Sequence, residues 1–141
     1  MKPQTDVFRS LGNAVRTLRA RVDRSLQRFG LRLGQYQVLL LLWDEDELTP
    51  REIAGRLGVE MPTVTRTVQR MVRDGLVSRC AHPDDARSVR ICLSDRGRAL
   101  RPTLAEIIQE ETEHSLRGFV AQERTTFARM LDRMAENNRE E

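Results

Sequence analysis

The polar side chains between residues 61 and 73 carry the clearest chemical signal in this sequence. They are hydrogen-bonding or cationic and none is acidic, whereas a helix face that is only solvated usually carries charges of both signs. Arg can donate two parallel hydrogen bonds to guanine, and Thr can reach base edges or phosphates. The pattern therefore predicts a surface that contacts DNA. Its members are Pro62, Thr63, Thr65, Arg66, Gln69, Arg70 and Arg73.

A second basic group surrounds the turn-forming segment 83–88. Arg87 lies within this segment, with Arg79 and Arg90 on either side. An Arg at the tip of a hairpin can enter a narrow minor groove, where the negative potential is strongest. Asp85 is placed to orient Arg87 through a charge-assisted hydrogen bond. We predict that Asp85 and Arg87 form a second DNA contact; an exposed turn with an incidental ion pair is the alternative.

Residues for other chemistry are sparse. His82 and His114 are the two histidines, and no nucleophile–base pair or Gly-rich phosphate loop accompanies them. Cys80 and Cys92 do not make a disulfide framework, and no Cys/His spacing resembles a zinc site. We therefore expect a protein that is not an enzyme and that has no cofactor and no metal site.

Residues 49–75 are predicted to position the first DNA-contacting group. Thr49 can cap a helix start while Glu52 reaches back to it, which is a capping box. Gly58 falls where this short helix must end and turn, and Gly75 closes the next one. The spacing predicts a helix-turn-helix, with an ordinary helical corner as the alternative.

A β-hairpin is predicted directly after these helices. Leu76–His82 and Val89–Leu93 have strand patterns, and residues 83–88 connect them with turn-forming types. Cys80 and Cys92 lie on the two arms, where their side chains can approach each other and oxidation can deform the hairpin. Inert packing of both cysteines is the alternative.

Long helices are predicted on both sides of this unit. The first carries an apolar stripe at alternating spacings of three and four, in which the polar Ser25 fills one slot: Phe8, Leu11, Val15, Leu18, Val22 and Phe29. The next helix ends at the acidic run 44–47, because acidic side chains oppose the dipole at a helix C-terminus. Beyond the hairpin, Ser94 caps a helix that Pro102 bends near its start, and a last helix follows Gly118. One small lobe cannot cover so long a stripe, which favours a subunit interface over an intramolecular core.

Length and composition fit this organisation. A chain of 141 residues can bury a core, and 32% charged with 4% aromatic residues suits a helical protein with charged faces. We expect a mainly α fold with a small β-hairpin wing: a winged helix-turn-helix domain over residues 35–94 and a helical dimerisation region over 1–34 and 95–141. No run approaches the ~18 apolar residues that a membrane span needs, and no secretion signal is present, so we expect a cytoplasmic protein.

Two stretches together resemble a known family. "LTPREIAGRLGVEMPTVTRTVQRMVRDGLVSR" and "HPDDARSVRICLSDRG", the latter with Pro-x-Asp-x-Arg spacing at Pro83, Asp85 and Arg87, are similar to the MarR family of bacterial transcription regulators. "LGQYQVLLLLW" is similar to the second helix of that family. The likeness extends over nearly the whole chain. The spacing in the hairpin, coupled to the helix-turn-helix, is its most specific part.

The resemblance implies a winged-helix homodimer whose terminal helices interlock. One helix of each subunit enters the major groove and the wing contacts the minor groove. Carried over to this sequence, Thr63, Thr65, Arg66 and Arg70 match recognition-helix positions, and Asp85 and Arg87 match the wing tip. The sequence also departs from the family. Glu60 stands where Ser or Asp more often caps the recognition helix, and Thr67 stands where Leu is usual, which predicts looser packing.

The resemblance further implies regulation by a small, often anionic aromatic, ligand that releases DNA. Arg16, Arg19, Tyr36 and Trp43 are the candidate lining residues; core packing of the two aromatic rings and surface positions for the arginines are the alternative. We therefore expect a sequence-specific regulator of double-stranded DNA, acting as a repressor on a palindromic operator. Redox regulation through Cys80 and Cys92, or non-specific architectural DNA binding, are the alternatives.

Overall fold

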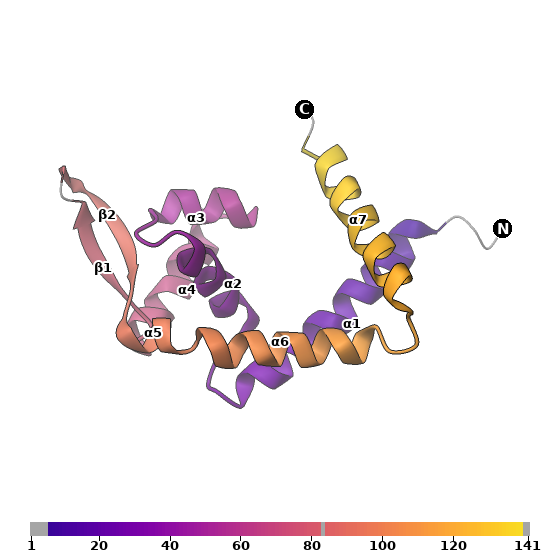
Figure 1. Cartoon of the computed structure of the whole chain (residues 1–141). Coiled ribbons are helices and arrows are strands. Elements are labelled where there is room, and N and C mark those ends of the chain that lie inside the picture. The colour runs from indigo at the N-terminus through magenta and orange to yellow at the C-terminus, as the bar shows by residue number, and fades with distance from the viewer. Residues whose placement is uncertain (1–5, 83, 140–141) are drawn as a thin grey trace.

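The structure, a computed structural model, describes residues 6–82 and 84–139, except for the side chain of Ala86. It is mainly helical with one antiparallel hairpin, as the sequence predicts (Figure 1). The helices are α1 (Val7–Gln27), α2 (Leu33–Asp44), α3 (Pro50–Leu57), α4 (Met61–Arg73), α5 (Asp95–Ala99), α6 (Arg101–Ser115) and α7 (Ala121–Asn137), and the strands are β1 (Val77–His82) and β2 (Asp85–Leu93).

The predicted helix boundaries of the helix-turn-helix are confirmed. Thr49 Oγ1 accepts a hydrogen bond from the Glu52 amide at 3.1 Å, and Glu52 Oε1 accepts one from the Thr49 amide at 3.2 Å. These bonds satisfy amides that a helix start leaves unpaired, and they lower the pKa of Glu52. Gly58 and Gly75 end α3 and α4 with φ of 65° and 74°, a region that glycine enters without a Cβ clash.

The hairpin differs from its prediction at the start of both strands, by one residue at Val77 and by four at Asp85. The register runs from Val77 opposite Leu93 to Ala81 opposite Val89, and after a bulge His82 pairs with Asp85. The second strand therefore begins at Asp85 rather than Val89, because Asp85 pairs with His82 and residues 86–88 form the bulge. Pro83, which belongs to the quoted family spacing, lies outside the described residues.

One apolar core fills the part of the molecule that holds α2, α3, α4 and the hairpin base. Leu39, Ile53, Met71, Leu76 and Ile91 are completely buried in it. On α4, the buried side chains recur at helical spacing, so the opposite face of this helix is left to solvent.

The region after the hairpin contains two helices rather than one bent helix. Ser94 Oγ accepts from the Gly97 amide at 3.0 Å and caps α5, as predicted, but α5 ends before Leu100 and α6 begins after it. Pro102 lies in the first turn of α6, where no helical hydrogen bond needs its missing amide proton, so the chain restarts there instead of bending. A Cβ on Gly97 would overlap the carbonyl oxygen of Leu76, so glycine permits α5 to close against the hairpin.

The remaining helices extend away from this core. Figure 1 shows α6 running from the hairpin base to the far end, where α7 stands beside the N-terminal half of α1. Glu111 on α6 accepts from Arg21 Nε at 2.8 Å and Ser25 Oγ at 2.7 Å, which fastens α6 to α1. Within the described residues, no helix is long and apolar enough to cross a membrane.

Candidate nucleic-acid interface

The exposed face of α4 holds the first predicted group. All seven of its side chains are exposed, while Val64, Val68 and Met71 on the opposite face are buried. The structure therefore brings the group together on one helix surface. These residues are Pro62, Thr63, Thr65, Arg66, Gln69, Arg70 and Arg73.

The start of α4 adds to the positive potential of this surface. Glu60 is the N-cap residue, and its side chain makes no capping bond among the described contacts, as expected from its type. The Glu60 carbonyl instead accepts from the amides of Thr63 and Val64. Helix starts carry a partial positive charge that favours phosphate groups, so α4 presents its dipole and its arginines at one surface.

The wing tip holds the second predicted group, and a hydrogen bond joins its two residues. Asp85 and Arg87 are both exposed. Asp85 Oδ1 accepts from the backbone amide of Arg87 at 3.0 Å, and within the described residues no ion pair joins the carboxylate to the Arg87 guanidinium. Asp85 thus stabilises the backbone of the wing tip, and it does not hold the Arg87 guanidinium in one direction. The predicted charge-assisted hydrogen bond is therefore present, and it reaches the Arg87 backbone amide rather than the guanidinium.

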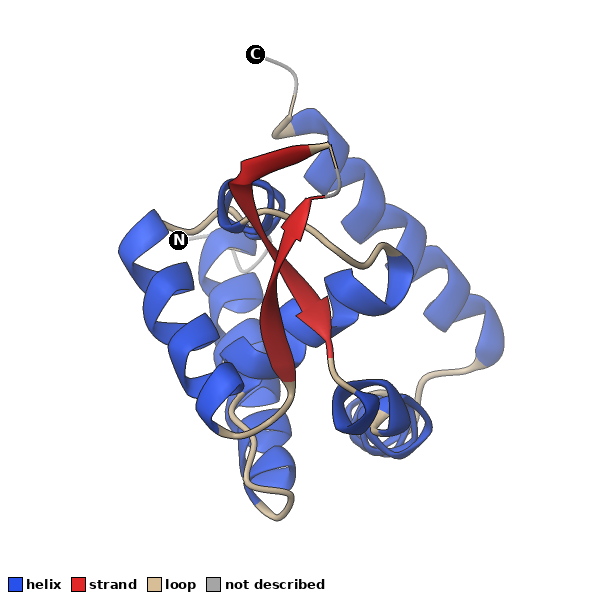
Figure 2. Ribbon diagram, turned by 90° about the vertical axis from the view of Figure 1, so that its left-hand side faces the viewer, coloured by secondary structure: helices blue, strands red, loops and turns tan. Residues whose placement is uncertain are grey.

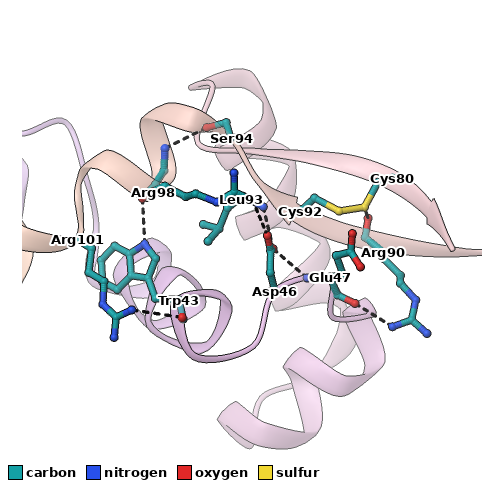
Figure 3. A network of polar contacts seen from close by, with 11 residues as sticks. Trp43, Asp46, Glu47, Cys80, Arg90, Cys92, Leu93, Ser94, Arg98 and Arg101 are labelled. Atoms are coloured by element: carbon teal, nitrogen blue, oxygen red, sulfur yellow. Dashed lines mark hydrogen bonds and ion pairs between the residues drawn. A yellow bond between two sulfur atoms is a disulfide. The ribbon is translucent and has the colours of Figure 1, made fainter. Parts of the chain in front are cut away.

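The hairpin is held against the loop between α2 and α3. The Ile91 amide donates to the Leu48 carbonyl at 2.8 Å. The Leu93 amide donates to Asp46 Oδ1 at 2.9 Å (Figure 3). Arg90 Nη1 donates to the Glu47 carbonyl at 2.9 Å. These bonds fix the wing relative to the helix-turn-helix. Figure 2 shows the two twisted strands crossing in front of the helices.

The two predicted ligand-binding aromatic residues pack against the core. Trp43 Nε1 donates to the Gly97 carbonyl at 2.9 Å, and the rings of Tyr36 and Trp43 meet edge to face with centroids 6.2 Å apart. Burial raises the pKa of Tyr36. Arg16, in contrast, is exposed near the N-terminus, where it bonds to Asn13. The structure therefore does not bring Arg16, Tyr36 and Trp43 together with Arg19.

A different set of residues surrounds Arg19. A cavity of about 510 Å³ lies between α1, α2 and α4 and is lined by Arg19, Ala20, Asp23, Arg32, Leu33, Gly34, Gln35, Thr67 and Arg70. Asp23 accepts from the Leu33 amide at 3.0 Å and pairs with Arg32 at 3.1 Å, and these contacts hold its pKa below the usual range. Sequence reasoning missed Arg32 and Arg70 as neighbours of Arg19. The available signal was the small side chains of Gly34 and Thr67, which lie next to each other in the lining of this cavity.

Cys80 and Cys92 approach each other as the hairpin register requires. Cys80 is opposite Arg90 and Cys92 is opposite Ser78, so the two cysteines are diagonal neighbours on the arms. The structure joins them in a disulfide with a Cα–Cα distance of 6.3 Å. Their predicted proximity is therefore present, and the disulfide links the two arms of the wing.

Comparisons with known proteins agree with this geometry. A model of the MarR family matches residues 31–89. The HTH-type transcriptional regulator TtmR of Methylorubrum extorquens (strain PA1) is 37% identical over 92 residues, which cover 65% of this chain and 44% of that protein. The chain thus matches less than half the length of this relative.

Solved structures share the fold over almost the whole chain. A MarR transcriptional regulator from Methanosarcina mazei Go1 superposes with a TM-score of 0.87 at 25% identity and covers 94% of this chain and 95% of its own. A MarR family regulator from Listeria monocytogenes, solved in complex with a 26mer DNA, superposes at 0.84 with 19% identity, covering 97% of this chain and 89% of its own. The second likeness shows the fold alone.

Proposed function

Because this chain belongs to the MarR family, we propose that it is a sequence-specific regulator that binds double-stranded DNA as a homodimer and represses transcription. The observation that carries the proposal is the exposed face of α4, which has hydrogen-bonding and cationic side chains and no acidic one. The solvated-face alternative predicts mixed charges there.

Each exposed group has its own role in the proposed complex. The major groove admits an α-helix, so α4 enters it. Arg66 and Arg70 bind guanine edges or phosphates, and the shorter side chains of Thr63 and Thr65 contact base edges or phosphates close to the helix. The guanidinium of Arg87 enters the adjacent minor groove. Base contacts by α4 supply specificity, and phosphate contacts by the remaining arginines supply affinity that depends on salt.

The far end of the molecule supports the homodimer. Apolar side chains of α1 and α7 line an open groove of about 630 Å³, and Val7 and Met130 there are 62% and 59% exposed. Exposed apolar surface of this kind marks interfaces, and a second copy offers the same surface. The apolar lining consists of Val7, Leu11, Ala14, Phe119, Phe127, Met130, Leu131 and Met134.

We therefore assign dimerisation to residues 1–34 and 95–141 and DNA binding to residues 35–94. A twofold axis through the far end places two copies of α4 on half-sites about one helical turn, or 10 base pairs, apart. The operator is then palindromic, because both subunits read the same half-site sequence.

The cavity beside Arg19 supports release of DNA by a small anionic ligand. Arg19, Arg32 and Arg70 line it with cations, of which Arg32 is already paired with Asp23, and Arg70 also belongs to the exposed face of α4. A carboxylate bound there pairs with Arg70 and withdraws it from a phosphate or base. Such a ligand binds the DNA-free form more tightly and shifts the population away from the complex.

Selection of bound sequences from a genomic library tests the DNA-binding proposal. We expect a palindrome whose half-sites lie about 10 base pairs apart, bound ~10³-fold or more tightly than random DNA at physiological salt. A reporter fused to the selected promoter should be more active in cells that lack the protein. Equal binding to random DNA would instead establish the architectural alternative.

The disulfide favours redox regulation as a second candidate. A Cys80 or Cys92 thiolate attacks a hydroperoxide and forms a sulfenic acid, with an alcohol as leaving product; the other thiol then displaces water and closes the disulfide. If oxidation deforms the wing, the dithiol and disulfide forms differ in operator affinity. Equal affinity of both forms, or an unchanged peroxide response after both cysteines are replaced by Ser, would remove this candidate.

A further inference from the structure

Glu47 lies beside the cysteine pair, although it belongs to the loop between α2 and α3. A carboxylate oxygen of Glu47 and the sulfurs of Cys80 and Cys92 are all within 4.8 Å of one another. Figure 3 shows the carboxylate directed toward the two sulfurs. Thiolates and carboxylates are ligands of Zn²⁺, and two thiolates on one tetrahedral ion with Zn–S bonds of about 2.3 Å stand close to 4 Å apart. Opening the disulfide therefore leaves three donors that one ion can bridge.

The backbone holds Glu47 in this position. Its φ of 61° is in the left-handed region, which a residue with a Cβ adopts only where surrounding contacts require it. The Glu47 amide donates to Asp46 Oδ1 at 2.8 Å, and its carbonyl accepts from Arg90 Nη1 at 2.9 Å. The next residue, Leu48, pairs with Ile91 of β2. The carboxylate is thus placed beside the hairpin before any ion arrives.

We propose that Cys80, Cys92 and Glu47 bind one thiophilic metal ion, Zn²⁺ or Cu⁺, when the cysteines are reduced. A dithiol reductant opens the bond: it gives two electrons and two protons to the two sulfurs and closes its own disulfide. The ion then displaces both thiol protons to solvent. For Zn²⁺, three protein donors leave a fourth position for water. Soft thiolates exclude Mg²⁺ and Ca²⁺ from this set.

The metal and the disulfide have different mechanical effects on the wing. The disulfide joins only the two arms, β1 and β2. An ion on all three donors also joins both arms to the loop that precedes α3 of the helix-turn-helix. The two states exclude each other because each needs both sulfurs. Metal occupancy therefore protects the pair from oxidation and fastens the wing to the DNA-binding helices.

Titration of the DNA-free protein tests this site. The chain is reduced, freed of reductant without air, and titrated with Zn²⁺ against a chromophoric chelator and with Cu⁺ against a Cu⁺-selective chelator. We expect one ion per chain for the reduced form and none for the disulfide form. Cys80→Ser and Cys92→Ser should each abolish this binding, and Glu47→Gln should weaken it tenfold or more. Glu45→Gln, an equal charge change two residues away in the same loop, should bind as the wild type does.

Three outcomes of the titration would overturn the proposal. Absence of stoichiometric binding, equal affinity of Glu47→Gln and Glu45→Gln, or undiminished binding by the disulfide form would each overturn it. If a Ser variant loses its helical circular dichroism, alkylation of the wild type replaces it: the ion should slow modification of both Cys80 and Cys92, and unchanged rates would overturn the proposal. Operator affinity is measured separately on metal-free protein, so failure of the proposed DNA binding is distinguishable from failure of this site.

Discussion

The winged part of the molecule (α2, α3, α4 and the hairpin) and its far end (α7 and the N-terminal half of α1) have similar apolar patterns. The apolar side chains are buried in the winged part and exposed at the far end. In the winged part, Leu39, Ile53 and Ile91 are completely buried by neighbouring elements of the same chain. At the far end, none of the residues of α7 is buried, and Phe127 and Leu131 are 40% and 37% exposed. Apolar side chains stabilise a fold only when they leave water, at about 25 cal/mol per Å². The winged part therefore completes its core within one chain, while the far end leaves apolar side chains exposed, as the proposed homodimer requires.

Truncation of the winged core should have the largest effect. Ile53→Ala removes a completely buried side chain of α3 and leaves a cavity, so the free energy of unfolding should fall by about 2 to 5 kcal/mol. Urea denaturation followed by circular dichroism measures this. Leu40→Ala, at a position 45% exposed on α2, is the control and should cost less than about 1 kcal/mol. Equal losses would contradict the described core.

A charge at the far end should separate the subunits and leave the winged part folded. Leu131→Glu places a carboxylate in the apolar groove, so we expect a monomer with operator affinity reduced about 100-fold or more, because two linked half-site contacts become one. Light scattering and fluorescence anisotropy measure mass and affinity. Gln122→Glu adds the same charge at another exposed position of α7 and should stay dimeric. A dimeric Leu131→Glu protein would place the interface elsewhere.

Removal of one positive charge should weaken operator binding when the residue lies in the winged part, but not when it lies at the far end. Arg66→Ala should weaken operator binding by about 1 to 3 kcal/mol and relax the preference at one base position, if this side chain contacts a base. Arg87→Ala should weaken binding and reduce the slope of affinity against salt by about one ion. Arg139→Ala, which removes an Arg paired with Glu136, should leave binding unchanged. Fluorescence anisotropy at several salt concentrations, with base-substituted operators, measures these affinities. A different order of the three losses would contradict the prediction.

The contact that fastens α1 to α6 should give a smaller, pH-dependent effect. The Ser25 hydroxyl, and then Arg21, lower the pKa of Glu111, so its stabilising contribution is present above its ordinary pKa and is lost as pH falls through the lowered folded value. Glu111→Gln should therefore be less stable than the wild type by about 1 to 2 kcal/mol at pH 7, with the difference shrinking in acid. Urea denaturation at pH 7 and pH 3 compares them. A difference that is constant with pH would show that the charge of Glu111 is not its cause.

Much of the fold could be predicted because its signals are local. The capping box at Thr49 and Glu52, the left-handed turns at Gly58 and Gly75 and the spacing of apolar residues act within a few residues of each other. The errors arose where a pattern allowed two outcomes. Pro102 is compatible with a bend or with a new helix start, and packing of α5 against the hairpin selects the new start.

The sequence by itself determined α3, α4 and the hairpin, together with the composition of the exposed α4 face, because caps, turns and periodicity encode them over short distances. Only the tertiary structure decided which distant residues meet. Trp43 bonds to the Gly97 carbonyl instead of lining a pocket. Arg70 lines the same cavity as Arg19, and a carboxylate oxygen of Glu47 lies beside the sulfurs of the two cysteines. Such tertiary contacts depend on how helices and strands pack, which the spacing within any one segment does not specify. The physical reason is that local backbone preferences fix elements, whereas burial of the shared core fixes their arrangement.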